Sequence, residues 1–374
     1  MWLTSSSIGR KFVMALTGIC LVLFVTFHCL MNSVAIFWPA AYNAICQFLG
    51  ANWYALVASM GLAALFIIHI IYALWLTVQN RKARGADRYE VNGSIPEVEW
   101  SSKNMLVLGI VVLAFLALHL IQFWAKMQLQ ELRCHELSAF PMVEGGIPAD
   151  PQFGTLFLQM AFSQWWTPVV YVIGFIALWF HMNHGFWSMF QTIGWNNQTW
   201  LPRLKSISCW WTSIVILLFV AQAAVFTWRA NEKYYTTDPA LVEQYIESLA
   251  ERATPAVHDF IPAYNDAMQM AQAMGDATPL VNLINEKGDY YLSELEPIAN
   301  AAAQFPAAAN NETIAACRRI VEEVKGWKEE IAAQAAQTAQ TAAAPGALIP
   351  EADADATEPA AAEAQPEQTE TTNE

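Results

Sequence analysis

The sequence predicts an all-α membrane protein with five transmembrane helices, followed by an acidic C-terminal extension that is partly helical and partly disordered. Five apolar segments are long enough to cross a bilayer, and 55% of the 374 residues are hydrophobic. The charge also changes sign along the chain. From Ala230 onward there are 7 Lys+Arg and 25 Asp+Glu, whereas residues 1–229 carry 12 Lys+Arg and 8 Asp+Glu.

The five apolar segments define the membrane part of the chain. A helix needs about 20 mainly apolar residues to cross a bilayer. The segments that meet this requirement are residues 11–37, 53–78, 104–124, 166–190 and 207–228. We therefore expect residues 1–229 to form one five-helix transmembrane domain, of which the first four helices build a bundle.

The loop charges predict the orientation of these helices. Lys and Arg gather before the first segment, between the second and third, and between the fourth and fifth. These residues are Arg10, Lys11, Arg81, Lys82, Arg84, Arg88, Lys103, Arg203 and Lys205. The N-terminus is therefore expected in the cytoplasm and the C-terminal tail in the periplasm of a bacterial inner membrane. The acidic balance gives no reason to expect a nucleic-acid partner.

The C-terminal extension divides into two parts. Residues 230–335 carry apolar side chains at helical spacing, which predicts an acidic helical region outside the membrane. The spacing is seen in Leu241, Tyr245 and Leu249, and again in Ile314, Cys317, Val321 and Val324. Residues 336–374 are rich in Ala, Thr, Pro, Gln and Glu, a composition that predicts a disordered tail.

Histidines dominate the chemistry of the predicted spans. His28, His69, His119, His181 and His184 lie inside the first four spans, and no Asp, Glu, Lys or Arg accompanies them there. Ionisable side chains inside a membrane are costly and usually functional. A lone histidine has about even odds of being a hydrogen-bonded structural residue, but five in four consecutive spans favour haem ligation, because haem iron accepts neutral imidazole nitrogen.

Depth along the helices sorts four of the histidines into two pairs. His28 follows Lys11 by 17 residues and His119 follows Lys103 by 16, so both lie roughly 25 Å from the cytoplasmic edge. These two are predicted to hold the distal haem.

The same count places the other pair nearer to the cytoplasm. His69 precedes Arg81 by 12 residues and His181 precedes Gly194 by 13, which corresponds to roughly 18–20 Å. His69 and His181 are predicted to hold the proximal haem. Both haems would be of the b type, because the chain has no C-x-x-C-H motif for covalent attachment.

Four glycines occupy positions where a haem would approach a helix that does not ligate it. Gly18 and Gly109 each lie ten residues before the histidine on their own helix, and Gly61 and Gly174 lie deeper in the membrane than His69 and His181. Close packing between membrane helices explains such glycines equally well.

His184 lies three residues after His181 and faces a similar direction on the helix. We prefer His181 as the ligand because Gly185, one turn further on, leaves room for the ring. His184 is then expected to contact a haem propionate or a quinone.

Two segments resemble a known family. Residues 5–11 (Ser-Ser-Ser-Ile-Gly-Arg-Lys), followed by residues 14–18 (Met-Ala-Leu-Thr-Gly) and His28, are similar to the start of single-chain di-haem cytochrome b subunits of succinate:quinone oxidoreductases. Residues 180–188 (Phe-His-Met-Asn-His-Gly-Phe-Trp-Ser) look like the fourth helix of that family. The resemblance covers about residues 5–229 and leaves the acidic extension outside it.

The resemblance implies the membrane anchor of a succinate dehydrogenase or fumarate reductase. A flavoprotein with FAD and an iron–sulfur protein would dock on the cytoplasmic face, and this chain would itself carry no dicarboxylate chemistry. Electrons would pass through the proximal and then the distal haem to a quinone, with menaquinone as the reasonable guess. Some relatives move protons through acidic residues, but residues 31–52 and 168–190 contain none, which puts such a path in doubt.

Two other functions fit the same residues. A di-haem cytochrome b of another respiratory dehydrogenase, such as a hydrogenase or a formate dehydrogenase, would share the haem chemistry. A haem-free transporter would instead line a substrate path with its histidines. Cys46 and Cys134 both lie in loops predicted on the periplasmic side of the membrane. The sequence is compatible with a disulfide between them and equally with two free thiols.

Overall fold

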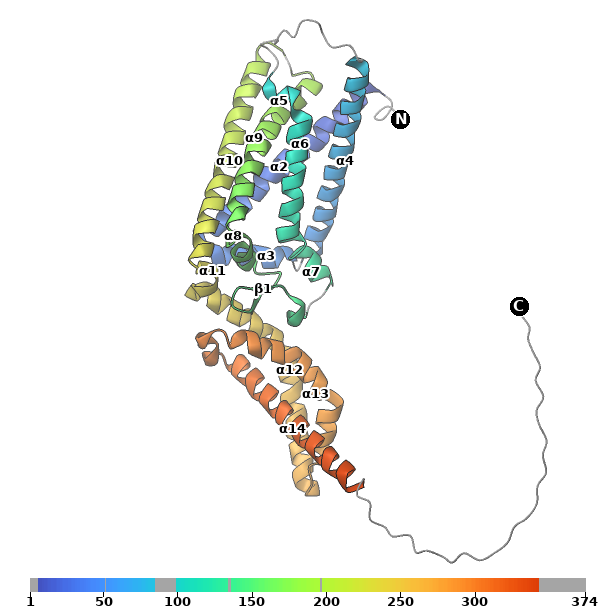
Figure 1. Cartoon of the computed structure of the whole chain (residues 1–374), viewed down its shortest axis with the longest axis vertical. Coiled ribbons are helices and arrows are strands. Elements are labelled where there is room, and N and C mark those ends of the chain that lie inside the picture. The colour runs from blue at the N-terminus through green and yellow to red at the C-terminus, as the bar shows by residue number, and fades with distance from the viewer. Residues whose placement is uncertain (1–5, 51, 85–98, 134–135, 196, 343–374) are drawn as a thin grey trace, which may run out of the picture. The chain divides into compact units, whose positions relative to one another are not determined.

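The computed structural model describes residues 6–50, 52–84, 99–133, 136–195 and 197–342 of the chain. In these residues the protein is all-α, apart from one antiparallel hairpin of two-residue strands, as the sequence predicts (Figure 1). The bundle helices are α2 (Ser7–Phe37), α4 (Trp53–Arg84), α6 (Met105–His119), α9 (Trp166–Thr192) and α10 (Trp200–Asn231). A short π-helix, η1 (Leu120–Trp124), continues α6.

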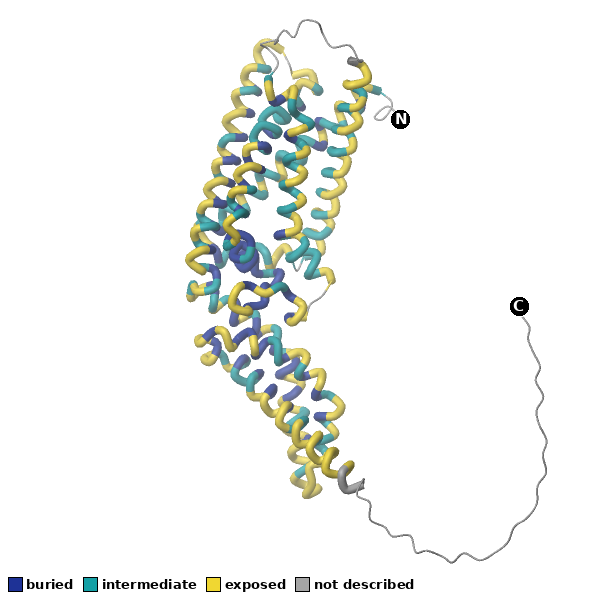
Figure 2. Tube along the Cα trace, in the orientation of Figure 1, coloured by how far each residue is buried: buried dark blue, intermediate teal, exposed yellow. Residues whose placement is uncertain are grey.

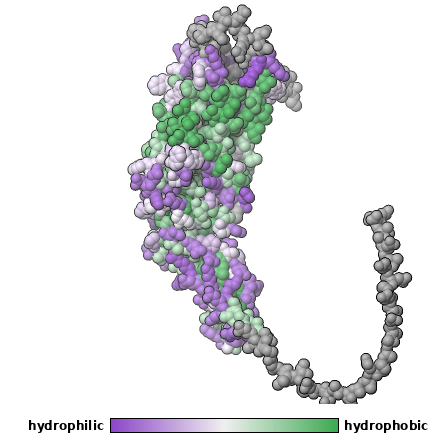
Figure 3. Space-filling model, viewed as in Figure 1, coloured by the Kyte–Doolittle hydropathy of each residue, from purple (hydrophilic) through white to green (hydrophobic). Residues whose placement is uncertain are grey.

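The five predicted spans are confirmed as long apolar helices. Each of α2, α4, α6 with η1, α9 and α10 is long and apolar enough to cross a membrane, which makes this a multi-pass membrane protein. Figure 3 shows a hydrophobic band over the upper part of the bundle, and a mainly hydrophilic surface over the helices that follow α10.

Helix α9 lies at the centre of the bundle, where it packs against α2, α6 and α10, while α2 also packs against α4 and α10. Burial is uneven among these helices (Figure 2). The most apolar window of α10 is 39% buried, whereas that of α4 has no buried residue. Helix α4 packs mainly against α2, with no residue of that window buried, and its apolar residues suit a membrane span.

Polar side chains fix the contact between α2 and α10. Gln222 donates to the main-chain oxygen of Cys29 at 2.8 Å and to the hydroxyl of Ser33 at 2.9 Å. Arg229 donates to the carbonyls of Ala35 and Ile36 at 2.7 and 2.8 Å. Carbonyls near a helix C-terminus lack partners within the helix, so these bonds satisfy groups that would otherwise be orphaned.

A cap of short elements covers the end of the bundle where α2 ends. Its elements are α3 (Pro39–Gly50), α7 (Gln128–Arg133), η2 (Leu137–Ala139), β1 (Met142–Val143), β2 (Ile147–Pro148), α8 (Gly154–Phe162) and α11 (Tyr234–Thr237). Eight of the nine residues of α8 are buried. Asn43 links the cap, because its side chain accepts from the Thr155 amide at 3.0 Å and donates to Gln244 at 3.1 Å.

The extension begins as the helices that its apolar spacing predicts. They are α12 (Pro239–Met274), α13 (Thr278–Ala302), the short η3 (Pro306–Asn310) and α14 (Glu312–Ala342). Asp238 caps the start of α12 by accepting from the Leu241 amide at 3.2 Å, and Gly275 ends it with a φ of +74°. All seven side chains that carry the spacing are buried, so this expectation is confirmed.

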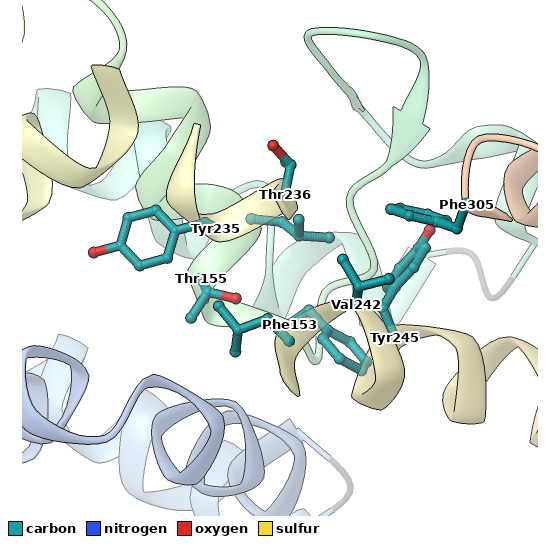
Figure 4. A pocket seen from close by; sticks show the side chains of 9 residues that line it. Phe153, Thr155, Tyr235, Thr236, Val242, Tyr245 and Phe305 are labelled. Atoms are coloured by element: carbon teal, nitrogen blue, oxygen red, sulfur yellow. The ribbon is translucent and has the colours of Figure 1, made fainter. Parts of the chain in front are cut away.

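The cap docks on α12 through one buried ion pair. Asp150 is 2% exposed, and its carboxylate accepts from Arg252 Nε at 2.9 Å and from another guanidinium nitrogen at 2.7 Å. Tyr245 adds a hydrogen bond from its hydroxyl to the Pro148 carbonyl at 2.7 Å. Figure 4 shows a small pocket at this joint. Its lining residues are Phe153, Thr155, Leu156, Tyr235, Thr236, Leu241, Val242, Tyr245 and Phe305.

Replacing Arg252 with methionine is expected to loosen this joint, because it leaves the Asp150 carboxylate buried without its cation. We expect a loss of about 2 kcal/mol, below the value for a fully buried pair because Arg252 is partly exposed. Thermal unfolding and limited proteolysis of the extension would measure the loss. Lys287→Met is the matched control, since the Lys287–Asp259 pair is exposed. Equal stability of the two variants would contradict the prediction.

Several predictions fall outside the described residues. Arg88, Cys134 and residues 343–374 belong to this group. Cys46 forms no disulfide with any described residue, and its thiol lies beside Tyr42. Burial raises the pKa of the Cys46 thiol to about 11, so the thiol is protonated at neutral pH.

Candidate functional site

His28 and His119 meet between α2 and α6. Their ring centroids are 5.8 Å apart and their planes are 88° apart. The rings lie among aromatic side chains: Phe24 stacks on His28 at 5.5 Å, and Phe123 lies 5.1 Å from His119. These are the two histidines that the depth count groups as the distal pair.

His69 and His181 meet between α4 and α9. Their ring centroids are 6.4 Å apart, with planes at 67°. Both rings are half-buried, and Nδ1 of His181 is buried without a hydrogen-bond partner among the described residues. An unpaired polar atom in an apolar interior is costly, so Nδ1 of His181 is a group for which a partner is expected.

Both separations suit two imidazoles that share one metal ion. An imidazole nitrogen bonds a first-row metal ion at about 2 Å, so two opposed rings on one ion have centroids about 6 Å apart. Among the described residues, no three His, Cys, Asp or Glu side chains gather as a metal site. Each pair therefore consists of two imidazoles without a third side chain of these types beside them.

The two pairs lie at different levels of the bundle. Thr17 on α2 contacts His69, and His28 lies 11 residues further along the same helix. Gly109 on α6 lies against His181, and His119 follows it by ten residues. At about 1.5 Å per residue, both helices place the pairs roughly 15 Å apart along the bundle.

A hydroxyl from a neighbouring helix contacts one ring of each pair. The Thr17 hydroxyl lies 3.1 Å from Nδ1 of His69, and the Tyr171 hydroxyl lies 3.2 Å from Nδ1 of His119. The Tyr171 hydroxyl also donates to Gln122 at 2.8 Å. Gln122 lies on the π-helix η1 directly after His119, and such π-turns are frequent at functional sites. Sequence reasoning missed both partners, because no local signal marks Thr17 or Tyr171.

His184 faces a different environment from His181. Its Nδ1 lies 3.7 Å from the Glu99 carboxylate, which also binds Lys205 at 2.8 Å. The ring stands edge-on to Trp187 at 4.8 Å, and Lys205 covers the Trp187 ring at 4.5 Å. The structure therefore brings His181 to His69 and places His184 in a polar cluster with α5 (Trp100–Lys103) at its edge.

The glycines differ in what surrounds them. A Cβ at Gly109 would lie 3.6 Å from His181 Cε1, and a Cβ at Gly18 would lie 3.9 Å from His69 Cε1. Both glycines thus face the proximal pair from helices that carry neither of its histidines. Gly174 packs instead against the Phe115 ring, which would lie only 2.5 Å from a Cβ at that position, so close helix packing explains this glycine.

Gly61 and Gly185 have no neighbouring atom within 4 Å of a Cβ position. Their suggested contact with haem remains a prediction. His258, the histidine of the extension, is exposed on α12.

No protein-family model matches the chain, and neither a curated protein nor a solved structure matches it. What the described residues offer chemically is a pair of neighbouring imidazoles at each of two levels of an apolar bundle.

Proposed function

We propose that this chain is the membrane anchor of a respiratory succinate dehydrogenase or fumarate reductase, and that it holds two b haems and exchanges electrons with a quinone. The observation that carries the proposal is the pairing of four intramembrane histidines, with ring centroids 5.8 and 6.4 Å apart. The haems, when bound, would supply one-electron transfer between the iron–sulfur partner and the quinone.

The residues present fit two haems on chemical grounds. The donors are imidazoles without a carboxylate in reach, as suits axial ligation of haem iron. At the proximal level, Nδ1 of His181 has no partner among the described residues, and glycines on α2 and α6 lie against the rings of His69 and His181.

The chain's own residues would bind the two haems and shield them from water. His69 and His181 would bind from α4 and α9, and His28 and His119 from α2 and α6. Thr17 and Tyr171 would orient two of these rings through hydrogen bonds. Aromatic side chains around His28 and His119 would exclude water from the distal level.

The two family-like segments support succinate:quinone oxidoreductase over other di-haem cytochromes. In the first segment, Ser6 caps α2 by accepting from the Gly9 amide at 2.9 Å, so the segment forms the start of the helix that carries Thr17 and His28. In the second segment, His181 faces His69, which agrees with its choice as the ligand over His184.

The loop charges give the proposed orientation. The N-terminus would lie in the cytoplasm and α12 to α14 in the periplasm of a bacterial inner membrane. The flavoprotein and the iron–sulfur subunit would then dock at the end of the bundle that carries α5, which is nearer to His69 and His181. His184, with Glu99 and Lys205 beside it, would lie on this side and contact a haem propionate or a quinone.

Haem content tests the proposal. The purified protein is expected to show a reduced-minus-oxidised spectrum of b haem, and a pyridine haemochrome assay is expected to give a ratio near two haems per chain. A ratio near one or zero would reject the di-haem model. A succinate-reducible spectrum and co-purification of a flavoprotein identify the complex, whereas co-purification of a hydrogenase or formate dehydrogenase would assign the chain to that enzyme.

A further inference from the structure

We infer that Thr17 and Tyr171 are positioning residues that each fix the tautomer and the basicity of one haem ligand, and so set the reduction potentials of the two haems separately. The inference rests on the proposed function. Neither residue contacts the iron: Thr17 acts through His69 and Tyr171 acts through His119.

The carbonyls around Thr17 favour one direction for the hydrogen bond at His69. The Thr17 hydroxyl lies 3.0 Å from the Val13 carbonyl and 3.1 Å from the Met14 carbonyl, in the preceding turn of α2. A hydroxyl has one hydrogen, and a carbonyl can only accept it. When the hydroxyl gives its hydrogen to one of these carbonyls, its oxygen accepts from the Nδ1–H of His69, and the lone pair on Nε2 is left for a metal ion.

The same reasoning fixes His119. The Tyr171 hydroxyl donates its hydrogen to the Gln122 side-chain oxygen at 2.8 Å, so its own oxygen accepts from the Nδ1–H of His119. Gln122 is held in turn, because its amide donates to Thr167 at 3.4 Å. Tyr171 is 4% exposed and Gln122 is 9% exposed, so water does not compete for these bonds.

The other ring of each pair has no such acceptor among the described residues. Nδ1 of His181 is buried and unpartnered. The ring nitrogens of His28 lie 3.3 and 3.4 Å from Asn32 Nδ2, which is a donor and cannot accept a proton from the ring. Among the described residues, only His69 and His119 therefore have a hydroxyl oxygen as partner for Nδ1, and these two rings belong to different pairs.

The expected change in the reduction potential has a definite direction. An imidazole that donates from Nδ1 is a more basic ligand through Nε2, and a more basic ligand stabilises the oxidised iron. Removing the acceptor is therefore expected to raise the reduction potential of that haem. We expect a shift of up to about tenfold in the ratio of reduced to oxidised haem at a fixed ambient potential, which is about 59 mV for one electron.

The experiment is a redox titration of the intact complex followed at the haem bands. Tyr171→Phe keeps the ring and removes the hydroxyl, and Thr17→Val keeps the volume of the side chain. Tyr171→Phe is expected to raise the reduction potential of only the haem component that His28→Ala eliminates. Thr17→Val is expected to raise the reduction potential of only the component that His69→Ala eliminates. Thr17→Ser, which keeps the hydroxyl, is expected to titrate as the wild type.

Two control variants remove hydroxyls that contact none of the four histidines. Thr77 on α4 donates to the Ala73 carbonyl, and Tyr54 is 64% exposed. Thr77→Val and Tyr54→Phe are expected to leave both components unchanged.

Haem content, measured on the same samples, separates failure of the inference from failure of the proposed function. Two haems per chain with potentials that do not respond to Thr17→Val or Tyr171→Phe would overturn the inference and leave the proposed function standing. A shift in the reduction potentials of both haem components in either variant would also overturn the inference. Absence of haem from the wild-type protein would overturn both.

Discussion

The His119→Ala protein is expected to lose the spectral component of one haem and to keep the other. The reason is that His119 is paired with His28 alone, at a centroid distance of 5.8 Å, while His69 and His181 form the other pair about 15 Å away along the bundle. His28→Ala is expected to lose the same component. Variants at His69 and His181 are expected to lose the second component. Low-temperature difference spectra and pyridine haemochrome content would measure both losses.

His184→Ala is the matched control for this series. Its ring lies against Glu99 and Trp187, so both haems are expected to remain. Loss of one shared component from the His28 and His69 variants would contradict the pairing. Loss of haem from the His184 variant, with retention in the His181 variant, would move the ligand by one helical turn.

Replacing Gly109 with leucine is expected to abolish the haem held by His69 and His181. A Cβ at this position lies 3.6 Å from His181 Cε1, an ordinary contact that alanine can make without displacing the ring. The branched end of leucine requires space beyond that contact and would push the imidazole or occupy the volume next to it. We therefore expect Gly109→Ala to retain two haems per chain and Gly109→Leu to retain one.

Val107→Leu supplies the control for Gly109→Leu, because it enlarges a side chain on the same helix that is 59% exposed on the bundle surface. Haem content and thermal stability would be measured on all three variants. Two haems in the Gly109→Leu protein would show that the space beside His181 is not used by a cofactor. Loss of both haems would point instead to general unfolding of the bundle.

The pairing of the histidines illustrates how far a count along the sequence can reach. A straight helix converts residue number into depth, so residues on different helices can be compared once the membrane edges are marked by charged residues. The count groups His28 with His119 and His69 with His181, and the structure places these rings side by side. The count gives a level in the membrane and does not say which face of a helix a side chain occupies.

The cap shows where sequence patterns fail. Helix α8 is nine residues long and buried on almost every side, so it has no polar face to create a helical period. The π-helix after His119 is likewise invisible in the sequence, because one extra residue in a turn leaves no compositional mark. Both elements depend on the helices that surround them.

Composition and local periodicity are enough to establish the five membrane spans, the helical character of the acidic extension and the presence of histidines at two depths. Each of these follows from a signal within one segment. The side chains that hold the rings follow only from how the helices pack. Thr17 is 52 residues from His69, and Tyr171 is 52 residues from His119, on neighbouring helices in each case. A hydrogen bond between two helices forms only when the rotation of both helices brings the donor and the acceptor together to within an ångström or so. No pattern within either helix encodes that rotation.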